Sequence, residues 1–415
     1  MTGITYEDFL DLDYEPSDTD LVCEFYVEPA SDMDVEAAAS RVASESSNGT
    51  WAELQVEGSV RDLSATACAI DGNSVTVAYP EALFEETNMP QILSCIAGNI
   101  LGMKAVERIR LRDCEWPEEL TTSFPGPQFG TSVREDIFDA GERPITATVP
   151  KPKVGLTTDQ HVRVGYEAWT GGIDLLKDDE NLTDQAFNPF EKRLKRSLEA
   201  RDRAEDETGE KKSYLVNVTA SGDEMLDRVD MAAEQGCEYV MVDVVTAGWA
   251  AVQQVRERCE KHGVAIHAHR AMHAAFDRVE THGVSMRVLA QVARICGVDH
   301  IHTGTADLGK LENEDTVGIN EWLYSDLHGL NDVLPMASGG LHPGLVPELV
   351  ERVGTNVGIQ AGGGVHGHPD GTHAGAKALR QAIDATMKGV ALDDYATGHP
   401  ELATALDEWG TQTPR

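Results

Sequence analysis

The stretch GGIDLLKDDENL, residues 171–182, places one lysine directly before three acids at the end of a predicted strand. Asp179 and Glu180 supply hard oxygen ligands of the kind that Mg²⁺ accepts, usually together with water and substrate oxygens. Lys177 repels a cation while it is protonated, but burial and neighbouring cations lower the pKa of a lysine. A neutral amine can attack CO₂ to form a carbamate, which would make Lys177 a third oxygen ligand. The alternative interpretation is a solvated charge run that opens a helix.

Two further strand ends carry polar residues two positions apart: Lys151 and Lys153 in KPK, and His267 and His269 in HAHR. Residues two apart on a strand share one face, so each pair points the same way. Surface lysines would explain KPK alone, and HxH alone would indicate a zinc hydrolase. His267 is also open to interpretation as a satisfied core histidine. Three such pairs on separate strands, with Lys177 and Asp179, favour one shared site.

Glycine-rich runs close the last two predicted strands. They read SGG at 338–340 and AGGG at 361–364. Backbone N–H groups at the last two strands of a barrel commonly hold a phosphate group. A glycine turn would explain either run by itself, and the two together favour phosphate binding.

Eight β-rich segments carry these residues, with amphipathic helical segments such as 223–236 and 285–297 between them. The segments are 145–155, 171–180, 212–220, 237–248, 264–272, 299–306, 333–341 and 356–365. Eight strand–helix units over roughly 250 residues predict a (β/α)₈ TIM barrel, whose active site lies at the carboxyl ends of the strands. A doubly wound open sheet is the competing fold, but no GxGxxG follows the first strand.

The first 125 residues predict a smaller α+β domain, ferredoxin-like in kind, that precedes the barrel. Strands are expected over 20–30, 50–58, 74–80 and 105–113, and helices over 32–46 and 89–102. A Pro- and Gly-rich stretch at 115–140 is the expected linker. The domain boundaries are therefore 1–125 for the α+β domain, 126–390 for the barrel, and 391–415 for an acidic C-terminal tail.

The chain is strongly acidic, with 71 Asp and Glu against 34 Lys and Arg and a formal net charge of −37. Such a surface repels phosphate backbones, which excludes nucleic acid as a partner. A moderately acidic mesophilic enzyme is the plain alternative, but the dispersed excess favours a surface adapted to concentrated salt. Seven scattered cysteines without a CxxC pair, no signal-peptide pattern and no membrane-spanning apolar run predict a soluble, cytoplasmic protein.

Several motifs together resemble one known family. GIDLLKDDE at 172–180 is similar to the signature GxDFxKxDE, with Leu175 in place of the phenylalanine. KPKVGL, HAHRAMHAAFDR, DHIHTGT, GKLE, ASGGLHPG and QAGGGVHGHPDG accompany it. On these motifs the sequence resembles the large subunit of ribulose-1,5-bisphosphate carboxylase/oxygenase (RuBisCO), in particular the archaeal (type III) branch. The resemblance extends from about residue 20 to residue 390.

The resemblance implies a role for each matching residue. Lys177 is expected to be carbamylated by an activating CO₂ and to bind Mg²⁺ with Asp179 and Glu180. Lys151 and His269 are expected to transfer protons, and Lys310 to stabilise incoming CO₂. The implied substrate-binding residues are Lys153, Arg270, His302, Ser338, Gly339, Gly340, Gln360, Gly362, Gly363, Glu45, Thr50, Trp51 and Asn99.

The implied reaction joins ribulose 1,5-bisphosphate, CO₂ and water into two molecules of 3-phosphoglycerate, with O₂ as a competing substrate in an oxygenase side reaction. Glu45, Thr50, Trp51 and Asn99 are expected to complete the active site of a neighbouring subunit, which implies a homodimer or a ring of dimers. The archaeal branch further implies a role in AMP and nucleotide salvage.

Two departures from the family pattern affect the expected site. In GTADLGKLE one additional residue separates Thr305 from Lys310, which bears on the discrimination between CO₂ and O₂. Val149 stands where many members have threonine, which removes one hydrogen bond near the substrate.

Two alternative functions stay open from the sequence. A RuBisCO-like enolase would act on a sugar phosphate without fixing CO₂. A non-catalytic barrel would bind sugar phosphates as a sensor or scaffold, and it would not need the lysine–carboxylate centre.

Overall fold

The computed structural model describes residues 2–309 and 315–413, which form two compact units. The first unit comprises residues 1–126, 272–296 and 326–330, and the second comprises 127–271, 297–325 and 331–415. Residues 272–296 therefore leave the second unit after one strand of its sheet and return to it before the next. As limits of independently folding domains, residues 125 and 390 stay a prediction.

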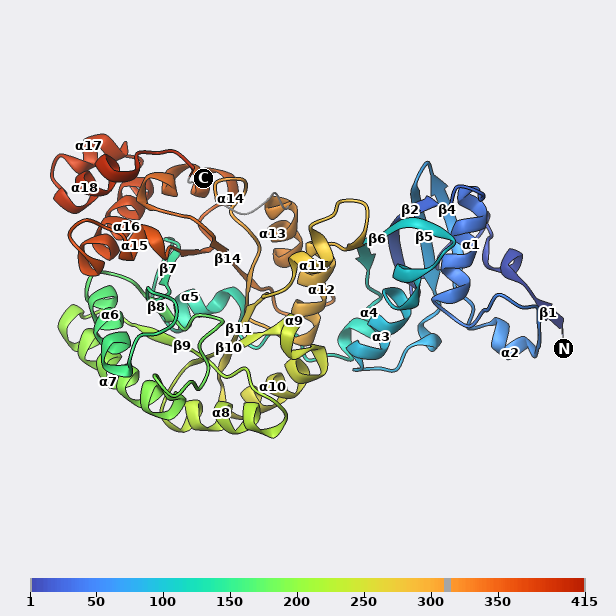
Figure 1. Cartoon of the computed structure of the whole chain (residues 1–415), viewed down its shortest axis with the longest axis horizontal. Helices are drawn as coiled ribbons and strands as arrows, with labels where there is room; N and C mark the ends of the chain where they lie inside the picture. The colour runs from blue at the N-terminus through green and yellow to red at the C-terminus, as the bar shows by residue number, and fades with distance from the viewer. Residues whose placement is uncertain (1, 310–314, 414–415) are drawn as a thin grey trace. The chain divides into compact units, whose positions relative to one another are not determined.

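The second unit is a closed barrel of eight parallel strands, which confirms the predicted fold and rules out the open sheet (Figure 1). Each predicted segment supplies one strand, and the last strand pairs with the first. The strands are β7 (Ile145–Thr148), β8 (Leu175–Lys177), β9 (Ser213–Asn217), β10 (Tyr239–Asp243), β11 (Ala265–His269), β13 (His300–His302), β14 (Leu334–Ser338) and β15 (Gly358–Gln360).

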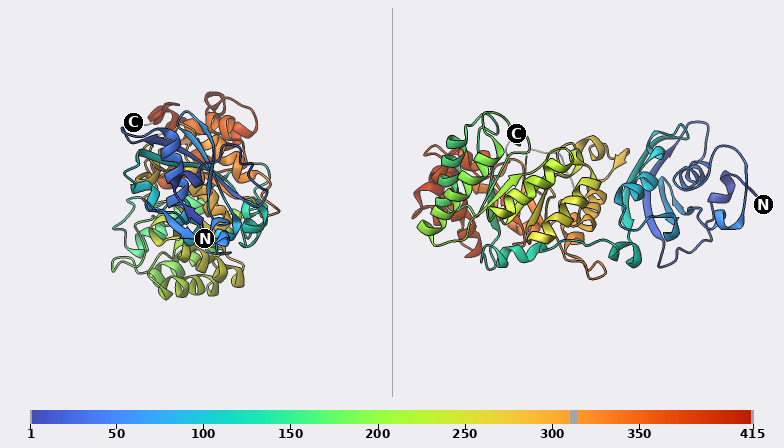
Figure 2. Two further views of the ribbon diagram at one scale, coloured as in Figure 1. Left: turned by 90° about the vertical axis from the view of Figure 1, so that its right-hand side faces the viewer. Right: turned by 90° about the horizontal axis from the view of Figure 1, so that it is seen from below.

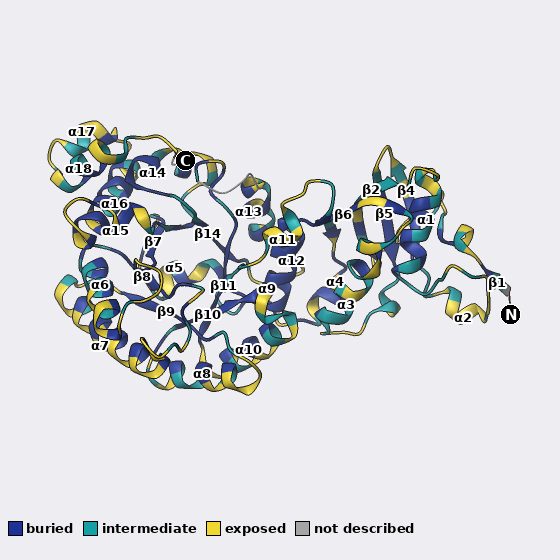
Figure 3. Cartoon of the chain, in the orientation of Figure 1, coloured by how far each residue is buried: buried dark blue, intermediate teal, exposed yellow. Residues whose placement is uncertain are grey.

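Helices surround the strands, as the right-hand view of Figure 2 shows for the green and yellow segments. They are α6 (Thr158–Thr170), α7 (Phe190–Thr208), α8 (Asp223–Glu234), α9 (Val244–Ala247), α10 (Trp249–His262), α13 (Thr316–Tyr324), α14 (Val346–Val353), α15 (Gly363–His366) and α16 (Thr372–Met387). α6 begins at a capping box in which Thr157 and Gln160 satisfy each other's backbone N–H groups. In Figure 3 the strands are buried while the outer faces of α7 and α8 are exposed, as amphipathic helices require.

Large apolar side chains fill the amino-terminal end of the barrel. Val133, in α5 (Val133–Asp136), and Phe138 pack against Ile145, Leu175 and Tyr239 from three strands. The rings of Phe138 and Tyr239 stack with their centroids 6.0 Å apart. The expectation of a plain linker over 115–140 was therefore wrong, because Val133 and Phe138 in its second half are core and Trp116, Leu120 and Phe124 in its first half are buried as well.

Asp299, directly before β13, binds the segment that precedes β7 to the barrel. Its fully buried carboxylate accepts backbone N–H groups from Phe129 at 2.6 Å, Gly130 at 3.0 Å and Ile266 at 2.8 Å. Burial raises the pKa of Asp299 even though these hydrogen bonds lower it. The Asp299 side chain thus binds both the segment at 129–130 and β11.

The first unit contains a five-stranded sheet in the order β12-β6-β2-β5-β4. The strands are β12 (Gly283–Val284), β6 (Val106–Glu115), β2 (Leu21–Pro29), β5 (Ser74–Tyr79) and β4 (Thr66–Asp71), and its main helices are α1 (Val35–Glu45), α3 (Met89–Ile96) and α12 (Met286–Cys296). The expected strand at 50–58 is only β3 (Leu54–Val56), paired with β1 (Thr2–Ile4) outside this sheet. β4 and β12 were not predicted from the sequence. Shorter helices complete the unit: α2 (Gly58–Arg61), α4 (Glu118–Thr122) and α11 (Ala274–Asp277).

The last 25 residues are partly folded onto the second unit. α17 (Leu392–Ala396) and α18 (Pro400–Trp409) follow α16, and Leu402 and Ala405 of α18 are buried. All seven cysteines are free thiols. Within the described residues, no helix is both long and apolar enough to cross a membrane.

A buried ion pair fixes the start of β8. Asp174 is fully buried and accepts two hydrogen bonds from Arg143, at 2.7 and 2.8 Å. It also accepts the backbone N–H of Thr146 at 2.8 Å. Burial raises the pKa of Asp174, but the charge and hydrogen bonds of Arg143 outweigh it, so the net pKa lies below the ordinary value.

Asp174→Asn is expected to lower the free energy of unfolding by about 3–5 kcal/mol at neutral pH, because it leaves Arg143 without its counter-ion. Since the folded pKa of Asp174 is depressed, its contribution is complete above the unfolded pKa of about 3.9 and is lost as pH falls through the folded pKa. Urea unfolding at several pH values measures this. The gap between wild type and variant must shrink in acid, and a gap that stays constant with pH would contradict the assignment.

Asp159→Asn is the matched control. Asp159 makes an exposed ion pair with Arg196 at 3.4 Å, with more than half of the Asp159 side chain accessible. Exposed pairs contribute little to stability, so this variant should unfold like wild type at every pH.

Candidate active site

Lys177 is the last residue of β8 and its side chain is fully buried. Its Nζ donates to the backbone oxygen of Asp178 at 2.8 Å and lies 3.6 Å from Glu180 Oε2. Burial lowers the pKa of the amine, although the charges of Glu180 and Asp179 raise it, and the net shift is downward. The neutral amine is therefore more accessible here than on an exposed lysine.

The carboxyl ends of β7, β8 and β15 meet beside Lys177. Lys151, three residues after β7, lies with its Nζ 3.3 Å from Asp179 Oδ2. A Cβ on Gly362 would lie 3.1 Å from Lys151 Cε, so the glycine permits close contact between that lysine and the loop after β15. Lys153 is exposed farther along the same loop.

His269 ends β11 between two carboxylates. Its Nδ1 lies 2.7 Å from Asp243 Oδ1 and its Nε2 lies 3.4 Å from Glu180 Oε2. The much shorter contact with Asp243 assigns the proton of the neutral ring to Nδ1, which leaves Nε2 as the nitrogen that can accept a proton. Burial and the charge of Lys177 lower the pKa of His269 despite the two acids. Asp243 was not predicted as a site residue, although it lies within the predicted segment 237–248; it is the last residue of β10.

His302 and His267 form a pair of imidazoles beside His269. His302 Nδ1 is 2.7 Å from the Ser338 hydroxyl, and its Nε2 is 2.9 Å from His267 Nε2. Burial and the neighbouring histidine charges hold the pKa of both rings well below the usual value, so both are neutral. His267 is a core histidine satisfied on one side only, because its buried Nδ1 has no hydrogen-bond partner among the described residues.

Asp178, between the predicted ligands Lys177 and Asp179, points away from them into the barrel wall. Its fully buried carboxylate accepts from Arg193 Nε at 3.1 Å, the Tyr214 hydroxyl at 2.5 Å and the backbone N–H of Asn217 at 3.0 Å. Tyr214 and Asn217 come from β9 and Arg193 from α7. Sequence reasoning missed this network because an acid in a charge run does not reveal which side chain turns inward.

The two glycine runs lie at the same carboxyl end of the barrel. Ser338 ends β14, and Gly339 and Gly340 follow with φ of 116° and 92°, a conformation that favours glycine. Gln360 ends β15, and its buried Oε1 has no hydrogen-bond partner in the described part of the chain. α15 begins directly after Gly362, so backbone N–H groups of both loops are available there.

The structure thus brings the expected residues of the second unit together at the carboxyl ends of the strands. Arg270 and His302 are buried there, after β11 and at the end of β13. Lys310 lies outside the described residues. Just before it, Ala306 and Asp307 both have positive φ, at 48° and 68°, which is where the additional residue falls. Val149 is buried.

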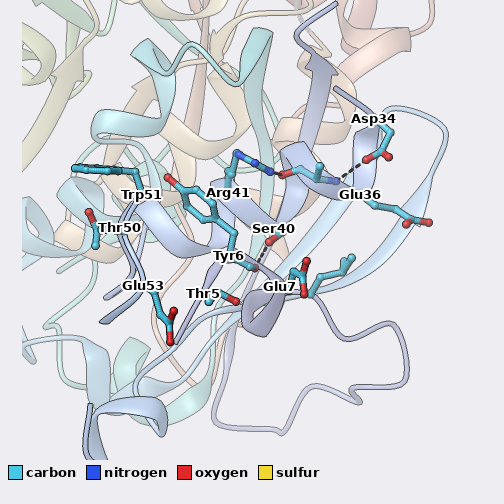
Figure 4. A pocket seen from close by; sticks show the side chains of 13 residues that line it. Thr5, Tyr6, Glu7, Asp34, Glu36, Ser40, Arg41, Thr50, Trp51 and Glu53 are labelled. Carbon is cyan, nitrogen blue, oxygen red and sulfur yellow. Dashed lines mark hydrogen bonds between the residues drawn. The ribbon is translucent and has the colours of Figure 1, made fainter. Parts of the chain in front are cut away.

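Four expected substrate-binding residues belong to the first unit. Glu45 ends α1, Asn99 begins a short 3₁₀ helix at Asn99–Gly102, and the Trp51 side chain is 83% exposed. Thr50 and Trp51 lie at the edge of a cavity of about 600 Å³ that Tyr6 and Arg41 also line (Figure 4). Among the described residues of the first unit, no single hydrogen-bond or ion-pair partner joins these four side chains.

Carboxylates and imidazoles alone do not assemble a metal site here. Among residues 2–309 and 315–413, no group of three or more His, Cys, Asp or Glu side chains is placed to hold a metal ion. The two imidazoles of HAHR have different partners, since His267 faces His302 and His269 binds Asp243.

Comparison with known proteins matches both units. The model of the ribulose bisphosphate carboxylase large chain, catalytic domain, matches residues 130–409, and the model of its N-terminal domain matches residues 8–120. Ribulose bisphosphate carboxylase of Pyrococcus furiosus is 49% identical over 417 residues, which cover 99% of either chain.

The chain belongs to the ribulose bisphosphate carboxylase large-chain family.

Solved structures of family members agree with this assignment. The octameric RuBisCO of Pyrococcus horikoshii, in complex with sulfate ion, superposes with a TM-score of 0.95 at 49% identity, covering 99% of this chain and 98% of the other. The dimeric archaeal RuBisCO of Hyperthermus butylicus superposes with a TM-score of 0.91 at 45% identity, covering 98% of this chain and 99% of the other. The chain lies on the archaeal type III branch of the RuBisCO family, as its motifs predicted.

The Asp178 network predicts a graded response to substitution. Arg193→Met leaves a buried carboxylate without its counter-ion and is expected to cost about 3–5 kcal/mol of unfolding free energy. Tyr214→Phe removes the hydrogen bond that the hydroxyl donates to Asp178 and the longer one, 3.2 Å, that it accepts from Arg193 Nε. It keeps the counter-ion and should cost less, about 1.5–3 kcal/mol. Arg196→Met, on the exposed face of α7, is the control and should change little. Equal urea midpoints for all three would contradict the network's role.

Proposed function

We propose that this chain catalyses the carboxylation of ribulose 1,5-bisphosphate, with an oxygenase side reaction. The observation that carries the proposal is the fully buried Lys177 amine beside the carboxylates of Asp179 and Glu180, at the barrel mouth of a RuBisCO family member. In the reaction, a new C–C bond joins CO₂ to C2 of the sugar. Water then adds at C3 and the C2–C3 bond breaks, which yields two 3-phosphoglycerates and two protons.

The donor set fits Mg²⁺ once Lys177 carries a carbamate. As an ammonium group Lys177 would repel a cation, but its lowered pKa favours the neutral amine that attacks CO₂. The product is an oxygen anion next to Asp179 and Glu180, and three oxygen donors with room for substrate oxygens suit Mg²⁺. Bound there, Mg²⁺ supplies a Lewis acid that polarises a substrate carbonyl.

Lys151 and His269 are the proposed proton-transfer groups. His269 is held by Asp243 in the tautomer whose Nε2 accepts a proton, and its depressed pKa keeps that atom free at neutral pH. Lys151 lies between Asp179 and Gly362, where it reaches both the carboxylate centre and the loop after β15. The two groups therefore approach the same space from β11 and β7.

Two phosphate subsites are proposed, both at the carboxyl ends of barrel strands. Arg270 and His302 would hold one phosphate, with Lys310 expected over the CO₂. Backbone N–H groups of the loops after β14 and β15, with Ser338 and Gln360, would hold the other phosphate and the sugar hydroxyls. The unpartnered Gln360 Oε1 supports this assignment, because it is an acceptor that a substrate hydroxyl would satisfy.

We also propose that the minimal active unit is a homodimer, alone or in a ring of dimers. Glu45, Thr50, Trp51 and Asn99 are implied as site residues, yet they belong to a unit that makes no barrel strand. The similar RuBisCO structures include an octamer and a dimer. The physiological source of the bisphosphate, nucleotide salvage, stays a prediction.

Lys177→Ala is expected to abolish CO₂ fixation while the protein stays folded, because the variant cannot form the carbamate. Fixation of radiolabelled CO₂ with ribulose 1,5-bisphosphate, in molar KCl and after preincubation with or without CO₂ and Mg²⁺, measures this. Wild type should give acid-stable label in 3-phosphoglycerate that depends on the preincubation. Lys195→Ala, an exposed lysine of α7, is the control and should retain activity.

Two results would overturn parts of this proposal. Appreciable turnover by folded Lys177→Ala would exclude the carbamate. No fixation by folded, oligomeric wild type would favour the RuBisCO-like enolase, whose product would carry no label from CO₂. A sugar-phosphate-binding scaffold would bind the bisphosphate equally well in the Lys177→Ala variant.

The net charge of −37 further leads us to propose adaptation to concentrated salt. Repulsion among the acids is screened over about 3 Å at 1 M salt but over about 30 Å at 0.01 M. Dialysis from molar KCl into dilute buffer is expected to unfold the protein or dissociate its subunits. Circular dichroism and light scattering measure this, and a signal and mass unchanged by dialysis would contradict salt adaptation.

A further inference from the structure

The C-terminal residues of the chain contact both glycine-rich loops of the proposed site. We define the C-terminal strap as residues 399–412, which contain α18, the first glycine loop as residues 338–342, and the second as residues 360–368. In Figure 1 α18 lies beside α17, close to α15 and α16. The strap belongs to the second unit, as do both loops.

Trp409, the last residue of α18, lies between one histidine from each loop. Its ring centroid is 5.8 Å from that of His342 in the first glycine loop and 6.3 Å from that of His368 in the second. Both imidazoles are almost fully buried, and the indole is half-buried. A single aromatic ring thus bridges the ends of the two loops.

Both histidines also bind the strap backbone. His368 Nδ1 accepts the backbone N–H of Asp370 at 3.1 Å, so Nε2 carries the proton and donates to the Glu401 carbonyl at 3.0 Å. His342 Nε2 lies 3.0 Å from the Gln412 carbonyl, which can only accept. The two loops therefore donate one hydrogen bond each to the two ends of the strap.

Close backbone approaches at two glycines fix this arrangement. A Cβ on Gly344 would lie 1.9 Å from the Gly410 carbonyl oxygen. A Cβ on Gly364 would lie 2.3 Å from the Leu341 carbonyl oxygen and 2.6 Å from His342 Cα. Gly364 brings the two loops together, and Gly344, two residues after the first loop, brings that segment against the strap. Because no side chain intervenes at either place, a shift of one segment changes the spacing of the others.

α16 holds the strap in place independently of the loops. Glu401 accepts from Lys377 at 2.7 Å and from Gln381 at 2.9 Å, and the backbone N–H of Leu402 donates to Gln381 Oε1 at 3.0 Å. The strap is thus anchored to α16 and contacts both loops.

We propose that the C-terminal strap sets the spacing of the two glycine loops, and that Trp409 is the positioning residue that tunes their affinity for the phosphorylated substrate. The inference rests on the proposed function, because it takes these loops as a phosphate subsite. Trp409 acts through His342 and His368, so its loss weakens substrate binding more than the chemical step. A change confined to ground-state binding raises KM and leaves kcat unchanged.

The test compares Trp409→Ala, Trp409→Phe and Tyr395→Ala in the full-length protein, in molar KCl. Tyr395 of α17 stacks on His399, the first residue of the strap, with ring centroids 3.9 Å apart. Its variant therefore removes a matched aromatic–histidine contact that involves neither loop. Trp409→Ala should raise KM for ribulose 1,5-bisphosphate about tenfold with kcat within about twofold. Trp409→Phe should restore most of the affinity, and Tyr395→Ala should match wild type.

The thermal shift caused by the bisphosphate gives a readout that does not depend on turnover. It should be smaller for Trp409→Ala than for wild type. If Trp409→Ala does not fold, Trp409→Leu keeps apolar volume without a ring and should show the same rise in KM. An active wild type with unchanged KM in a folded Trp409→Ala or Trp409→Leu variant would overturn the inference. A wild type that neither fixes CO₂ nor is stabilised by the bisphosphate would instead overturn the proposed function.

Discussion

Burial of the Lys177 amine is the constraint on which the site depends. A lysine that is shielded from solvent must lose its proton, pair with acids or be modified. Burial lowers the pKa of Lys177, and the acids that follow β8 include Glu180, whose carboxylate lies 3.6 Å from the amine. Asp178 and Asp179, the two acids that follow Lys177, have different roles. Asp179 faces Lys151 at the mouth, while Asp178 is turned into the wall, where Arg193 supplies its counter-ion and Tyr214 donates a hydrogen bond. The inward acid fixes the backbone that presents the outward one.

Other side chains at the mouth of the barrel are likewise held by a neighbour that is not itself a proposed proton-transfer group. Asp243 fixes the ring of His269, and His267 pairs with His302. Asp243 and His269 are partners at the ends of adjacent strands, and His267 lies two residues before the end of β11. In each pair one side chain orients the other. An arrangement of this kind keeps reactive atoms in place without substrate, which is what catalysis by preorganised groups requires.

The barrel and its mouth were predictable from sequence because strand ends, glycine turns and residue alternation are local signals. Supports such as Arg193 for Asp178 and the Phe138 plug were not, because they depend on contacts between distant segments. The helix at 400–409 shows the same limit, since an acidic tail gave no sign that Trp409 would contact two loops. Local patterns specify where elements lie, and packing decides which side chains hold them.

Electrostatics links the proposed reaction to the composition of the whole chain. A bisphosphate approaching a protein of net charge −37 is repelled at long range in dilute buffer, although Lys151, Lys153 and Arg270 would attract it at the mouth. Molar salt reduces the range of the repulsion to about 3 Å and leaves contacts within the partly buried site much less affected. The same salt that stabilises an acidic surface therefore also permits the basic site to bind an anionic substrate. On this argument, the acidic surface and the cationic mouth are compatible only under the salt conditions to which the surface is proposed to be adapted.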